Sequence, residues 1–160
     1  MITLDLETSG FSHRKDRIIE VGATKMRGQS VIDTFHSKIN PGLKISVDIQ
    51  ELTGLTNDEL SVAPTFKEIQ EDFLKFCFGH TIVGYNVAFD KRFLKAADRR
   101  FEHLIYFDYM GYVKKHYKDL DSYKMREVAR YFGIRFEKTH SALTDVKILN
   151  SIMVQAGWPV

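Results

Sequence analysis

The first ten residues, MITLDLETSG, hold the pair of side chains with the clearest chemical potential. Asp5 and Glu7 lie two apart in a stretch where Ile2, Leu4 and Leu6 alternate with polar residues. In a β-strand, residues i and i+2 point to the same face, so both carboxylates would project together. Two such carboxylates repel each other unless a pKa rises or a divalent cation binds their oxygens. The spacing favours a pair of metal ligands, and an edge strand with one solvated face is the alternative.

Three further residues could complete a site for phosphate chemistry. Asp90 begins a predicted helix, Asp145 lies in the first turn of the last predicted helix, and His140 precedes Asp145 by five residues. Four carboxylates from one strand and two helix starts could surround two hard cations, an arrangement suited to in-line displacement at phosphorus. A neutral histidine beside them could accept the proton of an attacking water. The His-x-x-x-x-Asp spacing is weak support by itself, because it occurs three times in the chain.

The elements that would position these residues follow from hydrophobic patterning. β-branched runs at Ile18–Lys25 and Val31–Ile39 are separated by a glycine-containing turn, so the first three strands form a predicted meander. Short apolar strands at Thr81–Val83 and Leu104–Phe107 alternate with helical segments further along the chain. The order is βββ, helices, β, helix, β, helices. It predicts one layered α/β domain over residues 1–160.

Capping residues set the expected limits of the helices. Thr56 with Glu59 and Thr65 with Glu68 have the spacing of capping boxes, and Ser122 stands where an N-cap belongs. A stripe of apolar residues includes Cys77, which we interpret as a buried small hydrophobe. The patterns predict helices at Ser46–Thr53, from Thr65 to Gly79, after GYNVAFD to about Arg100, and at Met110–Tyr117, Ser122–Phe132 and Ser141–Ala156.

Composition narrows the class of protein. A net charge of +2 is not the footprint of a generally basic nucleic-acid binder. Basic residues outnumber acids five to one within 91–100 and eight to four within 114–138, and they could line a nucleic-acid track or form solvated helix faces. The single cysteine excludes an internal disulfide, and no apolar run approaches the ~20 residues of a membrane span. We therefore expect a cytoplasmic protein with no membrane partner.

Three motifs of the chain resemble those of the DEDD exonucleases of the histidine subgroup, also called DnaQ-like. They read DLETSG from Asp5, IVGYNVAFD from Ile82 and HSALTD from His140, in the family's order and spacing. The intermediate segments LTGLT from Leu52 and SYKM from Ser122 are similar to the family as well. The resemblance covers nearly all 160 residues. It implies a ribonuclease H-like fold, with a mixed five-stranded sheet whose first strand is central and whose faces are flanked by helices.

The resemblance also implies an activity and a set of site residues. A 3′-to-5′ exonuclease of this family uses water to cleave the terminal phosphodiester bond and releases a nucleoside 5′-monophosphate. His140 would be the general base. The residues implied as ligands of two Mg²⁺ or Mn²⁺ ions are Asp5, Glu7, Asp90 and Asp145. The positions that match contacts to terminal nucleotides are Thr8, Ser9, Leu52, Asn86 and Phe89. For Leu52 and Phe89, core packing is an equal alternative.

Two positions depart from the family pattern. Tyr85 stands where many relatives have histidine, and Asp108-Tyr109 stands where many have a small hydroxyl residue after the acid. Neither is a metal ligand, so both bear on substrate choice. We expect single-stranded DNA or DNA 3′ ends as substrate, as in proofreading. An RNA-trimming or oligoribonucleotide-degrading enzyme and a catalytically silent binding module are the alternatives.

The partners and the extent of the full protein are less constrained by the sequence. A polymerase partner and a homodimer are both compatible with it, and neither can be deduced. The chain ends about four residues after the last predicted helix, so we expect a stand-alone nuclease or an excised domain without a polymerase-binding tail.

Overall fold

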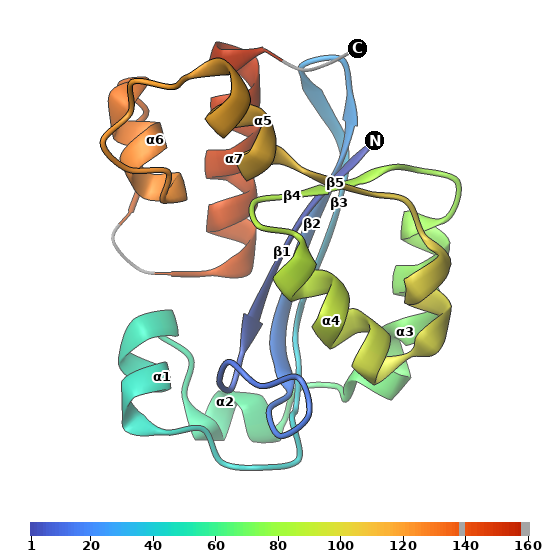
Figure 1. Ribbon diagram of the computed structural model, residues 1–160. Helices are drawn as coiled ribbons and strands as arrows, with labels where there is room; N and C mark the ends of the chain where they lie inside the picture. The colour runs from blue at the N-terminus through green and yellow to red at the C-terminus, as the bar shows by residue number, and fades with distance from the viewer. Residues whose placement is uncertain (138–139, 158–160) are drawn as a thin grey trace.

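A mixed five-stranded sheet runs through the computed structural model, which describes residues 1–137 and 140–157 (Figure 1). The strand order is β3-β2-β1-β4-β5, with β1 to β3 antiparallel and β4 and β5 parallel to β1. The strands are β1 (Ile2–Thr8), β2 (Ile18–Arg27), β3 (Ser30–Lys38), β4 (Ile82–Gly84) and β5 (Tyr106–Asp108). The expected mixed sheet with a central first strand is therefore confirmed.

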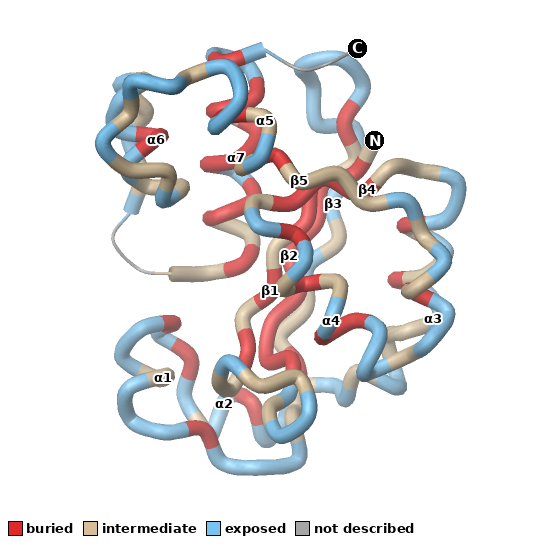
Figure 2. Tube along the Cα trace, in the orientation of Figure 1, coloured by how far each residue is buried: buried red, intermediate tan, exposed pale blue. Residues whose placement is uncertain are grey.

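Helices cover both faces of the sheet and one of its ends. In Figure 1, α3 and α4 lie on one face, α5, α6 and α7 lie on the other, and α1 and α2 lie beyond the end of β1. The helices are α1 (Val47–Thr53), α2 (Asn57–Ser61), α3 (Phe66–Cys77), α4 (Ala88–Ala97), α5 (Tyr109–His116), α6 (Met125–Tyr131) and α7 (Ala142–Ala156), with a 3₁₀ turn at Arg99–His103. The two-faced covering explains why the centre of the sheet is buried (Figure 2).

Strand β1 divides its side chains between the two faces. Ile2, Leu4 and Leu6 are buried in a core with residues of α3 and α4. The alternate side chains belong to the opposite face, against which α7 packs. Asp5 and Glu7 are among them, so the period-two pattern of the sequence places both acids on the α7 side of the sheet.

Most helix limits lie within one or two residues of expectation, and two differ by three. Helix α6 begins at Met125 rather than at Ser122, because the Ser122 hydroxyl accepts a hydrogen bond from the Lys124 N–H (3.3 Å) and holds a turn instead of capping the helix. The helix after β4 ends three residues early, at Ala97, because Asp98 has an extended backbone and caps the separate 3₁₀ turn. Local hydrogen bonds of polar side chains override the helical pattern at both places.

Other local predictions are confirmed. Both expected capping boxes form, Thr56 with Glu59 at α2 and Thr65 with Glu68 at α3. Cys77 is buried in the core, where burial raises the pKa of its thiol to about 12, so it behaves as a small hydrophobe.

Among the described helices, none combines the length and hydropathy needed to cross a membrane.

Candidate active site

The acidic end of β1 is joined to helix α4 by one hydrogen bond. The N–H of Leu6, which lies between Asp5 and Glu7, donates to Oδ1 of Asp90 (3.2 Å). Asp90 is only 4% exposed and lies in the first turn of α4. The backbone of β1 therefore holds Asp90 beside Asp5 and Glu7, the other two predicted ligands of this end of the sheet.

The start of α7 brings two more predicted residues to the same place. Asp145, in the first turn of α7, is 6% exposed. Oδ2 of Asp145 lies 3.4 Å from Nδ1 of His140, and Oδ1 accepts a hydrogen bond from Arg126 of α6 (2.7 Å). One potential ligand atom from each of Glu7, His140 and Asp145 lies within 4.8 Å of the other two. These are the residues that the sequence motifs grouped.

Burial raises the pKa of all four carboxyl groups, and repulsion by neighbouring acids of the cluster adds to the shift at Asp5 and Glu7. Burial is the main cause at each, and it raises the pKa of Glu7 to about 8 and that of Asp90 to about 7. The pKa of Asp5 lies well above its usual value because the charges of Asp90 and Glu7 add to the effect of burial. At Asp145 burial also raises the pKa, although Arg126 opposes the shift. The described groups thus form an acidic cluster with too little positive charge beside it.

This donor set fits hard divalent cations. Carboxylate oxygens are the ligands that Mg²⁺, Mn²⁺ and Ca²⁺ prefer, and a bound cation would stabilise the charged carboxylates that burial and repulsion disfavour. The residues that could hold such ions are Asp5, Glu7, Asp90 and Asp145, with His140 at the rim. His140 keeps a side chain that is 38% exposed, so solvent reaches it.

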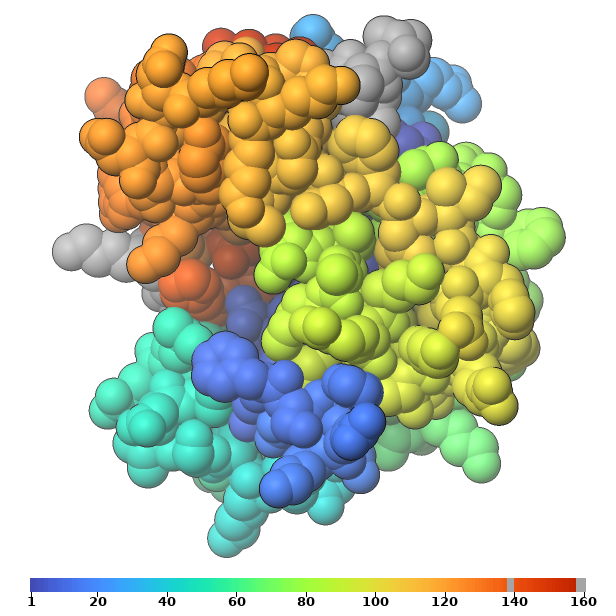
Figure 3. Space-filling model, in the orientation of Figure 1, coloured from blue at the N-terminus to red at the C-terminus, as the bar shows by residue number. Residues whose placement is uncertain are grey.

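The acidic cluster opens into a hollow of the molecular surface. Figure 3 shows this hollow between α1, α4 and α6, with the colours of β1 and α7 visible at its floor. A cavity of about 710 Å³ adjoins it, and its lining includes both His140 and Asp145. The cationic and aromatic side chains of that lining are Lys114, Lys124, Arg126, Arg130, Tyr85 and Tyr123. The acids therefore meet a cationic wall at the mouth of the site.

The five residues predicted to touch a nucleotide surround the cluster to different degrees. Leu52 of α1 is 45% exposed, and its carbonyl accepts a hydrogen bond from the His140 N–H (3.3 Å), so it lies at the site rather than in the core. Asn86, at a φ of 63°, is exposed and lines the cavity. Phe89 is half-buried and packs on Phe93.

The remaining two, Thr8 and Ser9, are engaged within the loop that follows β1. The Thr8 hydroxyl donates to the Gly10 carbonyl (2.6 Å), and the Ser9 hydroxyl accepts from the Arg17 N–H (3.0 Å). Both residues adjoin Glu7 in the chain, and these bonds hold the loop against the acidic end of β1.

Two residues of the site were not found from the sequence. Arg126 bonds to Asp145, donates to the Glu137 carbonyl (2.6 Å) and lies over the ring of Phe136. Glu20 of β2 is 2% exposed and pairs in register with Glu7. A lone acid within the apolar run IIEVGA was the available signal for Glu20, whereas the contact of Arg126 depends on the packing of α6 on α7.

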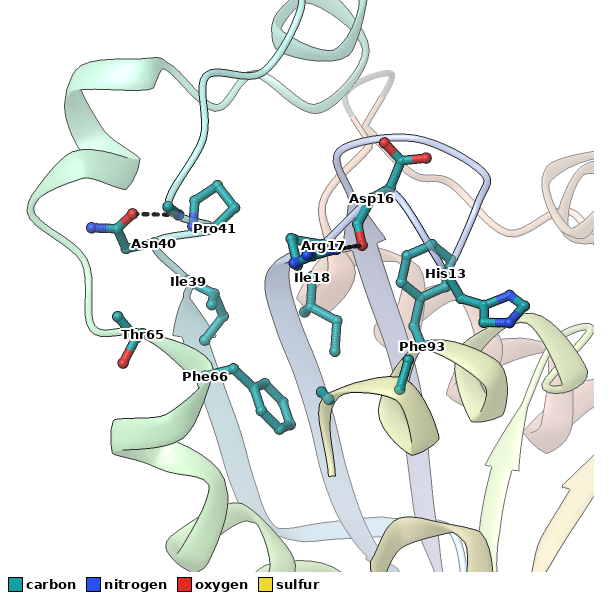
Figure 4. Close-up of a pocket in the computed structure, with 13 residues that line it drawn as sticks. His13, Asp16, Arg17, Ile18, Ile39, Asn40, Pro41, Thr65, Phe66 and Phe93 are labelled. Carbon is teal, nitrogen blue, oxygen red and sulfur yellow. Dashed lines mark hydrogen bonds between the residues drawn. The ribbon is translucent and has the colours of Figure 1, made fainter. Parts of the chain in front are cut away.

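A second cavity, of about 280 Å³, lies between the loop after β1, α3 and α4 (Figure 4). Its only acid among the described residues is Asp16, and the carboxylate of Asp16 points away from Phe66 and Ile39 at the cavity wall. That carboxylate accepts a hydrogen bond from the Ser12 N–H (2.9 Å) within its own loop. The acidic cluster at β1 is therefore the better site for chemistry.

The fold and this cluster together define a class, a ribonuclease H-like domain with a candidate two-cation site on its central strand. The particular family follows from comparison with known proteins. A family model described as exonuclease, RNase_T, matches residues 2–153, and the chain belongs to this exonuclease family. The resemblance drawn from the three motifs is thereby confirmed, and the chain is assigned to the hydrolases.

Curated relatives carry the same region within longer proteins. The chain is 32% identical over 158 residues to the PolC-type DNA polymerase III of Caldanaerobacter subterraneus subsp. tengcongensis, covering 96% of this chain and 11% of that protein. It is 27% identical over 158 residues to the DNA polymerase III epsilon subunit of Aquifex aeolicus, covering 96% of this chain and 78% of the subunit. The chain thus spans about a tenth of the PolC-type relatives that it matches.

Solved structures share the fold. An E. coli exonuclease I complex with single-stranded DNA, in a zinc-bound form, has a TM-score of 0.84 at 17% identity, over 97% of this chain and 39% of that one. The nuclease domain of 3′hExo, a DEDDh family member bound to rAMP, has a TM-score of 0.79 at 20% identity, over 98% of this chain and 92% of that one. The mixed sheet and its helices are therefore those of known exonucleases.

Proposed function

We propose that the chain is a 3′-to-5′ exonuclease that hydrolyses terminal phosphodiester bonds with the help of two divalent cations. The observation that carries this proposal is the convergence of Asp5, Glu7, Asp90 and Asp145 in one cluster, in which Asp90 and Asp145 are buried and Asp5 and Glu7 are partly buried. Such a cluster destabilises the fold unless cations bind to it. A metal-dependent function therefore explains why four acids lie together here. Its opening into a hollow gives a substrate access to the acids.

In this proposal the four carboxylates would hold Mg²⁺ or Mn²⁺. When bound, such cations lower the pKa of water and neutralise charge that develops on phosphoryl oxygens. The hydrogen bond from the Leu6 N–H fixes Asp90, and the ion pair with Arg126 fixes one oxygen of Asp145. Both contacts restrict the positions of the ligands.

His140 serves as the general base. Its Nδ1 lies 3.4 Å from Asp145, which leaves Nε2 to accept a proton from water. The backbone N–H of His140 donates a hydrogen bond to the Leu52 carbonyl, which anchors His140 to α1. Proton transfer therefore depends on the contact between α1 and the start of α7.

The terminal nucleotide would lie between α1 and α4, with Leu52, Asn86 and Phe89 beside it and the loop at Thr8 and Ser9 at its base. The rest of a strand would follow the cationic cavity, where the side chains of Lys114, Lys124 and Arg130 are exposed. Exposed cations bind phosphates without reading sequence, and Tyr123 offers a ring on which bases can stack. The product would be a nucleoside 5′-monophosphate.

We infer that single-stranded 3′ ends of DNA are the substrate. The relatives named above are a PolC-type DNA polymerase III and, from another organism, a DNA polymerase III epsilon subunit, and one structural neighbour is a complex with single-stranded DNA. These names support a proofreading-like role, with a polymerase as partner. The one free, buried cysteine fits a cytoplasmic location for it.

An RNA substrate is a second candidate with an observation behind it. The structural neighbour 3′hExo is bound to rAMP and covers nearly the whole chain. A preference for RNA would need a contact to the 2′-OH. A silent binding module is less well supported, because all four predicted carboxylates are present and converge.

Degradation of matched 5′-labelled DNA and RNA oligonucleotides tests the proposal. We expect a ladder that shortens from the 3′ end with Mg²⁺ or Mn²⁺ and stops with EDTA, faster on DNA than on RNA. Faster shortening of RNA would assign the trimming role instead. The chain would be a binding module if a folded sample shortened neither oligonucleotide with either metal and its activity did not differ from that of the Asp90→Asn variant.

A further inference from the structure

Glu20 is a buried acid that the proposed chemistry does not use. It lies on β2 opposite Glu7 and is 2% exposed. Both of its oxygens accept hydrogen bonds. Oε2 accepts from the Ala142 N–H (3.0 Å), while Oε1 accepts from the Ser141 hydroxyl (3.1 Å) and from Nε2 of His36 on β3 (2.7 Å). The carboxylate therefore joins the start of α7 to two strands of the sheet.

These contacts give Glu20 the role of a helix cap. The first N–H groups of a helix have no partner within it, and a carboxylate at this end also interacts favourably with the helix dipole. Ser141 is the residue before α7, and its side chain makes no capping hydrogen bond to the first turn of this helix. Glu20, 122 residues away from Ala142 in the chain, supplies the acceptor instead.

Gly22 lies two residues after Glu20, on the same face of β2. Because it has no side chain, α7 comes into direct contact with β2 there. A Cβ atom at Gly22 would lie 2.5 Å from both the Ala142 carbonyl carbon and the Leu143 nitrogen. Gly22 pairs in register with Asp5, as Glu20 pairs with Glu7. The first turn of α7 thus rests on the backbone of β2, directly beside the two acids of β1.

We propose that Glu20 is a positioning residue: by fixing the first turn of α7 on β2, it sets the places of His140 and Asp145 relative to Asp5 and Glu7. The proposal rests on the function proposed above. His140 immediately precedes Ser141, and Asp145 lies three residues after Ala142, so a shift of this turn moves both groups together. Displacements of about 1 Å at reacting groups cost up to ~100-fold in rate.

The same helix and strand offer a matched control. Nδ2 of Asn150, about two turns further along α7, donates to Oγ1 of Thr24 on β2 (2.9 Å). Both residues are buried, as Glu20 is. Thr24→Val removes this hydrogen bond between α7 and β2, together with the bond between the Thr24 and Thr3 hydroxyls (2.7 Å), but leaves the first turn of the helix untouched.

The test compares Glu20→Ala, Glu20→Gln and Thr24→Val in the full chain. We would measure the melting temperature, kcat and KM on a 5′-labelled oligothymidylate, and Mn²⁺ affinity by calorimetry without nucleic acid. We expect Glu20→Ala to lower kcat about 10- to 100-fold and Mn²⁺ affinity about tenfold, with KM within about twofold. Glu20→Gln, which keeps the shape and one acceptor oxygen, should recover most of both losses. Thr24→Val should lower the melting temperature and keep kcat within about twofold.

Two results would overturn the proposal. Equal losses of kcat in Thr24→Val and Glu20→Ala at equal melting temperature would mean that Glu20 only stabilises the packing of α7. A Glu20→Gln variant as inactive as Glu20→Ala, with fewer Mn²⁺ ions bound per chain, would make Glu20 a metal ligand.

Two further arms keep the outcome decisive. If Glu20→Ala does not fold, Ser141→Ala removes one donor to Glu20, and the proposal then requires a fall of a few-fold in kcat. If the wild-type chain degrades no oligonucleotide, the function proposed above fails, and Mn²⁺ affinity alone still decides the role of Glu20.

Discussion

The acidic cluster and the cationic cavity adjoin each other but hold their charges in opposite ways. Asp90 and Asp145 are almost completely buried, and burial is the largest cause of their raised pKa values. Lys114, Lys124 and Arg130 are exposed on the cavity wall, and Arg130 is already paired with Glu127. Buried charges lower the stability of the fold, whereas exposed charges affect it little and are screened by salt.

This difference assigns the two regions different tasks. A buried group responds strongly to a single substitution or to one bound ion, because water cannot compensate for the change. Exposed cations act together, and each contributes a small, salt-dependent share of binding. We therefore expect catalysis to depend on individual acids and substrate affinity to depend on the sum of the cations.

The largest effect is expected at Asp145. Asp145→Asn keeps the shape of the side chain and an acceptor for Arg126 but removes the charge that would bind a cation. We expect kcat to fall about 1,000-fold or more, with a melting temperature within a few degrees of wild type. Kinetics on labelled DNA and thermal unfolding measure both, and Asp33→Asn, at an exposed acid of β3, is the matched control. An unchanged kcat would separate the cluster from catalysis.

The second effect is on stability and follows from the raised pKa values. Glu7 has a pKa of about 8 and Asp90 of about 7 in the folded chain, well above their usual values of 4.5 and 3.8. The folded state therefore binds more protons than the unfolded state between those limits, and stability is lost as pH rises.

With EDTA present, we expect the melting temperature to fall by about 5 °C between about pH 5 and pH 8 and then to level off. Mg²⁺ should restore it at pH 8 and have little effect at pH 5, because cations bind the deprotonated carboxylates. Thermal unfolding of wild type and of Glu7→Gln provides the measurement. A Glu7→Gln curve as steep as that of wild type would place the titrating groups elsewhere.

The smallest effect is expected in the cavity. Replacing Lys114, Lys124 and Arg130 together by glutamine should raise KM for a single-stranded oligonucleotide about tenfold at low salt and leave kcat nearly unchanged. The dependence of KM on salt should also weaken, because fewer counterions are released. Glutamine at Lys67 and Lys75, two exposed lysines of α3 on the other face of the sheet, is the control. Equal effects per charge removed in the two sets would mean that only net charge matters.

The sequence was most informative where the determining interactions are local or periodic. The alternation Ile2 to Glu7 correctly placed both acids on one face, because strand geometry fixes it. The three motifs brought Asp90, His140 and Asp145 into the same group, and the structure places them together.

The contacts that the sequence did not reveal span long separations or depend on tertiary packing. Glu20 bonds to residues more than 120 positions away, and Arg126 reaches Asp145 only because α6 packs on α7. No local pattern encodes either contact. Ser122 had the right residue type for a helix cap, yet its hydroxyl stabilised a turn.

The central claim is that the clustered carboxylates of β1, α4 and α7 form a cation site. Calorimetric titration of Mn²⁺ into the EDTA-treated, dialysed chain tests this claim most directly. We predict about two ions bound per chain at pH 8, with proton release, and a loss of this binding in a chain that carries both Asp5→Asn and Glu7→Gln. The absence of Mn²⁺ binding in wild type, or equal binding in the double variant, would contradict the assignment of this cluster as the metal centre of the exonuclease.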